Sequence, residues 1–361
     1  GFELFLRIVS IIGSLTFLSR VLGYIRDFLM ALVLGASYIS DAFFVAFKLP
    51  NLFRRLFAEG AMNSAFIPVI SGVKEKNGKE GAGEFLSEML SIIFSFLLFF
   101  VIIFEIFMPY IIFVVAPGFE GNPSKFSLTV QLSRLTFPFL LFICLSSLIG
   151  GYLNTMSKFA AMAFTPVILN LLMLTVLLLS ITNSESQEIT AKFLASSISI
   201  AGVIQLIWLF YHLKVNKIEL SINSFLLKKI FPISVEAKKL FSLFLPAAIG
   251  NGVYQINLLI DMILASTLPD GSISFLYFAD RINQLPLGVL GIALSTALLP
   301  ILSQQIKKKQ DTVATETLNH CLQIAVIFSI PASAGLILLS EPIVSVLFVR
   351  GEFTNNDALL T

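Results

Sequence analysis

The sequence has few of the groups that metal binding and catalysis use. Its 361 residues include two cysteines, Cys144 and Cys321, and two histidines, His212 and His320. Both cysteines lie within apolar runs, so we expect neither a disulfide framework nor a thiolate metal site. No His/Cys/Asp/Glu cluster has metal-ligand spacing, and no Ser-His-Asp set, P-loop or catalytic pair of carboxylates is recognisable. We therefore expect no metal, no cofactor and no catalytic residue.

Charge is also scarce. Only 13% of the residues are charged, against about 25% in an ordinary soluble domain. Hydrophobic residues make up 57% of the chain, and the mean hydropathy is +0.91. The net charge of +2 is too balanced for a nucleic-acid-binding protein. This composition excludes a soluble globular protein and predicts an all-α polytopic membrane protein.

Stretches without charge mark the membrane spans. Residues 135–157, 159–184, 240–260 and 282–306 contain no Asp, Glu, Lys or Arg, and each is long enough for the roughly 20 residues that cross a bilayer as a helix. Nine spans and the start of a tenth near residue 357 are predicted, at 4–34, 41–72, 86–115, 128–153, 160–181, 191–212, 240–267, 273–302 and 319–347.

The loops between these spans differ in basic charge. One alternating set holds thirteen lysines, whereas the other holds only Lys125, Lys192 and Arg350. Because basic loops stay in the cytoplasm, this asymmetry predicts a cytoplasmic N-terminus. Within the basic set, residues 216–239 mix apolar residues with paired lysines. We expect an amphipathic linker along the cytoplasmic interface, with an unstructured basic linker as the alternative.

The chain is internally similar at an offset of about 232 residues. AFIPVIS at 65–71 matches ALLPILS at 297–303, and PYIIFVVAPG at 109–118 matches PIVSVLFVRG at 342–351. An even number of spans separates the equivalents, which predicts a parallel repeat. We expect a first lobe of six spans at 1–215, the linker at 216–239, and the start of a second lobe at 240–361. Two full repeats need about 464 residues, so we expect a truncated chain.

The first two spans carry charges at membrane depth. A charge at the centre of a lipid-facing helix costs about 3 kcal/mol, so these side chains must face one another or a watery cavity. At about 100° per residue, Asp41, Lys48, Arg55 and Glu59 form one stripe, with Pro50 interrupting the helix. The eight charged residues are Arg20, Arg26, Asp27, Asp41, Lys48, Arg54, Arg55 and Glu59.

Charges recur at equivalent places in the second half, with Asp261 in the seventh span and Asp280 and Arg281 in the eighth. One interpretation is a set of structural ion pairs: Arg26 with Asp27 or Asp41, Arg55 with Glu59, and Arg281 with Asp280. The other is a cavity between two lobes whose arginines grip a phosphate or diphosphate in bidentate fashion. Asn170 and Gln205 are expected to make hydrogen bonds between helices.

Two long stretches, SRVLGYIRD (19–27) and SDAFFVAFKLPNLFRRLFAEGAMNSAFIPV (40–69), resemble the MurJ (MviN-type) lipid II flippases. APGF at 116–119 and residues 135–155 and 277–303 are similar to the family as well. The resemblance implies the MOP/MATE-like fold, with two pseudo-symmetric six-helix lobes. It also implies export of lipid II, the polyprenyl-diphosphate-linked peptidoglycan precursor, across the bacterial inner membrane for cell-wall growth and cell shape.

The resemblance also assigns roles to residues. The substrate-binding arginines fall on Arg20, Arg26, Arg54 and Arg281, with acidic neighbours Asp27, Asp41, Glu59 and Asp280. As a separate hypothesis from the residues, we expect transport by alternating access in a monomer, helped by the membrane potential or by Na⁺ or H⁺ coupling, with Asp261 as the candidate for coupling. Three alternatives stay open: an exporter of another polyprenyl-diphosphate-linked glycan, a multidrug antiporter of the same superfamily, and a membrane enzyme of polyprenyl-phosphate metabolism.

Overall fold

The computed structural model describes residues 2–220 and 233–361, and every regular element in these two ranges is a helix. Half of the predicted linker at 216–239, residues 221–232, therefore lies outside the described residues, and residues 235–239 belong to the helix that follows. The first range contains α1 (Phe2–Leu34), α2 (Tyr38–Arg54), the π-helix η1 (Arg55–Met62), α3 (Asn63–Ile106), α4 (Met108–Val115), the 3₁₀ turn η2 (Pro117–Gly121), α5 (Pro123–Thr136), α6 (Phe139–Thr155), α7 (Ala160–Asn183) and α8 (Gln187–Val215).

The second range begins with a long helix at the position of the predicted seventh span. Its elements are α10 (Val235–Ser266), α11 (Ser272–Pro286), the π-helix η4 (Leu287–Ile292), α12 (Ala293–Lys307), α13 (Asp311–Leu338), α14 (Ser340–Phe348) and α15 (Asn355–Leu360).

Helix ends follow the local chemistry of the sequence. Gly35 adopts φ +62 directly after α1, a left-handed conformation that suits glycine at a helix end. Ser37 then caps α2 by a reciprocal capping box with Ser40. Pro138 separates α5 from α6 within the predicted span 128–153. These signals place the turns between helices.

Two predicted spans are wrong at their C-terminal ends. Residues 86–115 form no single helix, because α3 ends at Ile106 and the separate helix α4 follows. The span predicted at 319–347 breaks in the same way between α13 and α14. Pro109 and Pro342 lie in the first turns of the short helices, where a proline is tolerated because its missing N–H has no intrahelical partner. The apolar run continues past a point at which the helix stops.

Within residues 2–220 and 233–361, seven helical stretches are long and apolar enough to cross a membrane. One of them, Tyr38–Ile106, has 69 residues, which is enough for two crossings of roughly 20 residues each. Its helix bends at Gly78, whose φ of 73 lies outside the helical region. The predicted span 273–302 falls on the consecutive helices α11, η4 and α12. The chain is therefore a multi-pass helical membrane protein.

The helices repeat at the offset seen in the sequence. The π-helices η1 and η4 begin 232 residues apart, at Arg55 and Leu287. The short helices α4 and α14 also begin 232 residues apart, at Met108 and Ser340. A π-helix is rare and strained, so its recurrence at the same offset is strong support for the internal repeat.

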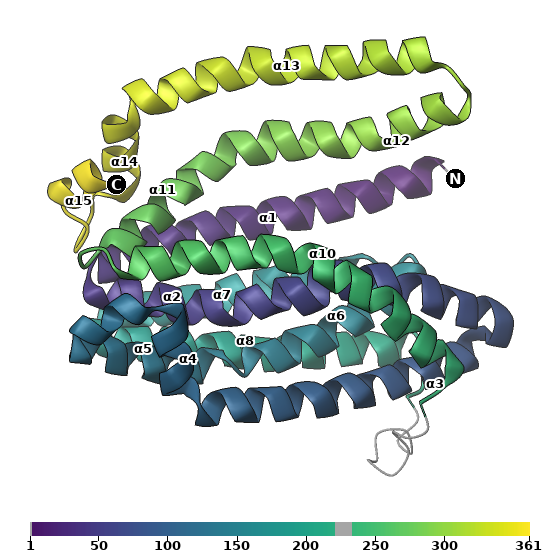
Figure 1. Ribbon diagram of the computed structural model, residues 1–361, viewed down its shortest axis with the longest axis horizontal. Coiled ribbons are helices and arrows are strands. Elements are labelled where there is room, and N and C mark those ends of the chain that lie inside the picture. Colours follow the sequence, from purple (N-terminus) through teal and green to yellow (C-terminus); the bar gives the residue numbers. More distant parts are fainter. Residues whose placement is uncertain (1, 221–232) are drawn as a thin grey trace.

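The two halves meet at one end of the bundle, which we call the closed end, where α14 contacts α1, α11 contacts α2 and α10 contacts η2. In the first half, α1 packs against α7, α2 against α5, and α3 against α6, while α10 of the second half packs against η1 and α3. In Figure 1, α1 and α10 run apart toward the N-terminal end of α1. This divergence leaves the middle of α1 facing α11 across an interface between the two halves.

Candidate binding site and the closed end of the bundle

A buried carboxylate joins α1 to α11, and the arginine beside it joins them to α7. Asp27 of α1 is 1% exposed, and its Oδ1 accepts hydrogen bonds from Arg26 Nη2 at 3.1 Å and from the Tyr277 hydroxyl of α11 at 2.8 Å. Its second oxygen pairs with the Arg281 guanidinium, also from α11. Arg26 Nη1 donates to Asn170 Oδ1 of α7 at 2.8 Å. Two guanidinium groups thus share one carboxylate, which leaves the group with a net positive charge.

The interhelical hydrogen bonds expected from the sequence are present. Asn170 donates to the backbone oxygen of Ser19 at 3.0 Å in addition to accepting from Arg26. Gln205 of α8 donates to the backbone oxygen of Thr165 in α7 at 2.7 Å. Both predictions are confirmed. Asn170 therefore orients the Arg26 side chain that lies against Asp27.

One of the expected ion pairs is different in the structure. Arg281 pairs with Asp27 rather than with its neighbour Asp280, and the Asp280 carboxylate accepts from Gln284 Nε2 at 2.8 Å. Adjacent residues of a helix point about 100° apart, so Arg281 reaches across to α1 while Asp280 stays exposed. Of the alternatives for Arg26, the pair with Asp27 forms.

Small residues leave room for arginine side chains that cross between α1 and the segment formed by α11 and η4. A Cβ atom on Gly23 of α1 would lie 3.2 Å from Arg281 Nη2, and one on Gly288 of η4 would lie 3.0 Å from Arg20 Nη1. Arg20 and Arg281 therefore cross the same interface from opposite sides. Arg20 is exposed and Arg281 is 23% exposed, so both retain N–H groups that an anionic ligand can reach.

The π-helix changes the pairing of the next charges. Arg54 Nη1 pairs with Glu59, and Arg54 Nε donates to Asn51 Oδ1 at 3.0 Å. The expected Arg55–Glu59 pair is wrong. An α-helix brings residues four apart together, whereas the wider turn of a π-helix brings residues five apart together. Because η1 begins at Arg55, Glu59 falls beside Arg54, which an ideal α-helix would direct away from the polar stripe.

Charges from three helices lie near one another next to this pair. Lys48 of α2 is exposed, and Asp280 of α11 and Asp261 of α10 both lie close enough for electrostatic interaction with it, as does Arg55. Asp261 and Asp280 are exposed as well. The charges of the second half therefore face those of the first half, as the sequence predicts for the two repeats.

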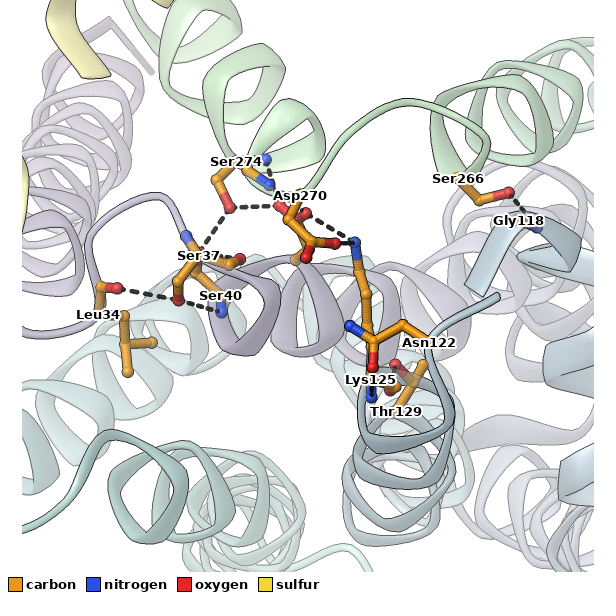
Figure 2. Close-up of polar contacts among 12 residues, drawn as sticks. Leu34, Ser37, Ser40, Gly118, Asn122, Lys125, Thr129, Ser266, Asp270 and Ser274 are labelled. Atoms are coloured by element: carbon orange, nitrogen blue, oxygen red, sulfur yellow. Dashed lines mark hydrogen bonds and ion pairs between the residues drawn. The ribbon is translucent and has the colours of Figure 1, made fainter. Parts of the chain in front are cut away.

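Asp41 does not belong with the rest of the predicted stripe. It is 0% exposed, and its carboxylate accepts from Lys125 Nζ at 3.0 Å, from the Gly271 backbone at 2.7 Å and from the Ser274 backbone at 2.9 Å. These partners belong to α5 and to the start of α11, at the closed end of the bundle (Figure 2). Asp41 therefore serves a contact between the two halves there.

Lys125 is the residue that the sequence reasoning missed. It is 3% exposed, lies 4.3 Å from the centre of the Phe119 ring, and donates to Asp270 Oδ1 at 2.8 Å as well as to Asp41. The Ser40 and Ser274 hydroxyl oxygens lie 2.6 Å apart beside it. We call Ser40, Asp41, Lys125, Asp270 and Ser274 the end latch. Its signal in the sequence was that Lys125 and Asp270 lie in loops predicted on the same side of the membrane, where the predicted span that begins at Asp41 also starts.

The arrangement suits an anion bound between the halves. Arg20, Arg54 and Arg281 are at least partly exposed, and a guanidinium fork binds phosphate oxygens through two parallel N–H···O bonds. Among the described residues, no group of three His, Cys, Asp or Glu side chains is placed to hold a metal ion. The site offers positive charge and hydrogen-bond donors.

A family profile described as "Lipid II flippase MurJ" matches residues 30–361. The chain is 39% identical over 351 residues to the probable lipid II flippase MurJ of Rhizobium tropici, covering 97% of this chain and 64% of that protein. It is 38% identical over 356 residues to the corresponding protein of Rickettsia prowazekii, covering 97% of this chain and 67% of that protein. The chain thus spans about two thirds of the length of these curated relatives.

Solved structures agree with the fold. A lipid II flippase MurJ in an inward closed conformation is 30% identical and superposes with a TM-score of 0.78, covering 97% of this chain and 69% of that one. An inward-facing multidrug resistance MATE family transporter of the MOP superfamily is 15% identical, with a TM-score of 0.73 over 94% of this chain and 75% of that one. The second likeness shows a shared fold only.

Proposed function

This chain belongs to the MurJ lipid II flippase family, and on that premise we propose that the protein carries lipid II from the inner to the outer leaflet of the bacterial inner membrane by alternating access. The observation that carries this proposal is the shared Asp27 carboxylate between Arg26 and Arg281. A structural pair needs one cation for one anion, whereas this group keeps an excess of positive charge for an anionic ligand.

In this proposal the diphosphate of lipid II binds Arg20, Arg26, Arg54 and Arg281. When the site is empty, Asp27 and Glu59 pair with three of these guanidinium groups and leave one positive charge uncompensated. When the diphosphate binds, its oxygens replace the carboxylates as partners, so the contact between α1 and α11 through Asp27 weakens. A ligand that binds one arrangement of the halves more tightly shifts the population toward it. Binding therefore favours the rearrangement that exposes the headgroup on the other side.

The remaining assignments belong to the same proposal. Residues 1–215 and 240–361 act as the two lobes, the protein works as a monomer, and the N-terminus and the lysine-rich loops face the cytoplasm. The end latch then lies on the outer side, and the diverging helix ends open toward the cytoplasm where lipid II is made. The long polyprenyl chain stays in the bilayer while the headgroup enters sideways.

Transport in this proposal draws on the membrane potential and on a cation at Asp261. Moving two negative charges outward against a negative interior gains roughly 4–5 kcal/mol per 100 mV. Asp261 lies close enough to Lys48 of the first half for electrostatic interaction, so a cation at this carboxylate changes the charge between the halves. We expect Asp261→Asn to remove the dependence of transport on Na⁺ or H⁺. Unchanged ion dependence in this variant overturns that role.

The experiment uses the full-length protein in bacteria depleted of their own lipid II flippase. Lipid II accessible at the outer leaflet is quantified for the wild type, for Arg26→Ala and for the matched control Arg7→Ala, whose side chain is exposed on the same helix. We expect restoration by the wild type and the control, and loss in an Arg26→Ala variant expressed at the same level. If all three proteins restore outer-leaflet lipid II, the proposed binding site is contradicted and the proposed function is supported. Restoration by none favours another polyprenyl-diphosphate-linked glycan as the substrate.

A further inference from the structure

An apolar pocket lies between the two halves, away from the charged interface of α1 and α11. Its cavity volume is about 200 Å³, several times the roughly 30 Å³ that one water molecule occupies. Phe57 and Ala58 of η1, Phe96 of α3 and Cys144 of α6 line it, and Phe244 of α10 closes it from the second half. The Cys144 thiol is the most polar side chain in the lining. No residue of the charged site takes part.

The nature of the lining decides what can fill this space. A bound water needs two to four polar partners, which this pocket does not supply. An empty space would leave the lining side chains without dispersion contacts on one side. Hydrocarbon satisfies the lining without needing hydrogen bonds, so the pocket suits an apolar ligand.

The mouth of the pocket faces the bilayer. Phe96 lines the pocket and is also 52% exposed, and Phe99, one turn further along α3, is 67% exposed. Figure 1 shows this half of α3 along the outer edge of the bundle. Because α3 belongs to a membrane-spanning stretch, the medium outside Phe96 and Phe99 is the hydrocarbon of the bilayer. A lipid chain reaches the pocket without crossing water.

We propose that this pocket binds one acyl chain of a bilayer phospholipid. The chain enters past Phe96 and lies between η1 and α10, in contact with both halves of the molecule. It therefore stabilises the arrangement in which α10 packs against η1 and α3.

The pocket is also adjacent to the charged site. η1 presents Phe57 and Ala58 to the pocket, while its Glu59 pairs with Arg54. Cys144 in the pocket wall lies close enough to Arg54 for electrostatic interaction. An acyl chain that holds η1 in its π-helical form thus supports the position of Arg54. Binding of an acyl chain requires no transport, so the photolabelling test of this proposal is independent of the proposed function.

The test is photolabelling in vesicles of phosphatidylethanolamine and phosphatidylglycerol that contain a trace of phosphatidylethanolamine with a diazirine on its acyl chain. The full-length protein is reconstituted and irradiated, and labelled peptides are mapped by mass spectrometry. We expect label on the segments around Cys144 and Phe244 as well as on the exposed Phe99. In Ala58→Phe, whose new ring fills the pocket, label at Cys144 and Phe244 falls about tenfold, equivalent to ~1.4 kcal/mol of binding, while label at Phe99 is unchanged.

Ala160→Phe is the matched control, because Ala160 is exposed at the start of α7. The same ring added there leaves the pocket open to the acyl chain. Leu148→Phe fills the pocket from α6 and serves as the second variant if Ala58→Phe does not fold. Equal labelling of the segments around Cys144 and Phe244 in a pocket-filling variant and in the Ala160→Phe control overturns the proposal. Loss of pocket label on adding polyprenyl phosphate, with no loss on adding phospholipid, overturns the choice of an acyl chain.

Discussion

Asp27 shows how a single carboxylate organises the charged interface. It accepts from Arg26 and Tyr277 and pairs with Arg281, so the positions of α1 and α11 both depend on it. Buried ion pairs add little net stability, but removing one partner is costly because the other charge is left buried. The main role of the Asp27 side chain is therefore to hold the two arginines in place. It adds little stability compared with an apolar residue at the same position.

We predict that Asp27→Asn lowers the free energy of unfolding by about 3 kcal/mol, because an amide does not neutralise the buried Arg26 guanidinium. Thermal unfolding in detergent measures the effect. Asp280→Asn is the control, since Asp280 is exposed and bonds only a neighbouring Gln284 in the same helix. We expect the control to change stability by less than about 1 kcal/mol. Equal losses in the two variants contradict the role assigned to Asp27.

Lys125 has the opposite charge balance, with one cation between two carboxylates. Its removal leaves Asp41 buried and places two negative charges from different halves next to each other. We predict that Lys125→Met opens the end latch more often. With cysteines at Ser40 and Ser274, cross-linking by a mild oxidant is expected to slow about tenfold, which corresponds to ~1.4 kcal/mol. An unchanged rate shows that the serine contacts and helix packing suffice.

At the scale of elements, the π-helix η1 determines which side chains face the site and which face the pocket. The π register places Glu59 beside Arg54 and turns Ala58 toward apolar side chains. An α-helix over the same residues would place residue 58, four after Arg54, at the ion-pair position. The π and α registers therefore predict different free energies of unfolding for a variant in which the carboxylate is moved from residue 59 to residue 58.

The double substitution Ala58→Glu with Glu59→Ala moves the carboxylate in this way. In the π register we expect a loss of about 3 kcal/mol or more in the free energy of unfolding, because an unpaired carboxylate enters an apolar pocket. Glu59→Ala alone is the control, with a loss of less than about 1 kcal/mol, since Glu59 is 53% exposed. Thermal unfolding of the three proteins distinguishes the registers. Equal stability of the double variant and the control indicates an α-helix.

At the scale of the whole molecule, the end latch and the diverging helices define one of the two states that the proposed alternating-access cycle requires. The latch joins the halves through Ser40 and Ser274, whose hydroxyl oxygens are 2.6 Å apart. We predict that Ser40→Cys with Ser274→Cys, in a protein whose Cys144 and Cys321 are replaced by alanine and serine, forms a disulfide that stops lipid II export. Because the disulfide only prevents opening of this end, reduction restores export.

Outer-leaflet lipid II before and after a thiol reductant is the measurement. Ser40→Cys alone, treated with the same oxidant, is the control and is expected to export normally. Full export by the oxidised double variant contradicts opening at this end. Loss that reduction does not reverse points to damage rather than to a locked state.

The sequence predicted the helical class, most of the spans and the internal repeat, because each of these is a property of residues near one another in the chain. A span is recognised from the hydropathy of about 20 consecutive residues. The repeat is recognised from short matching segments, and the π-helices at Arg55 and Leu287 recur at the same offset. The residues of the charged site were named from their unusual place in apolar helices.

The choice of partners was decided only by the tertiary structure. Asp27 bonds Tyr277, 250 residues away in the chain, and Asp41 bonds Lys125, 84 residues away, and no local pattern encodes which of several carboxylates a cation meets. The register of η1 also depends on its packing against α10 and α3, which is why Arg54 rather than Arg55 pairs with Glu59. Hydropathy is local along the chain, whereas ion pairing depends on distances between helices that only packing sets.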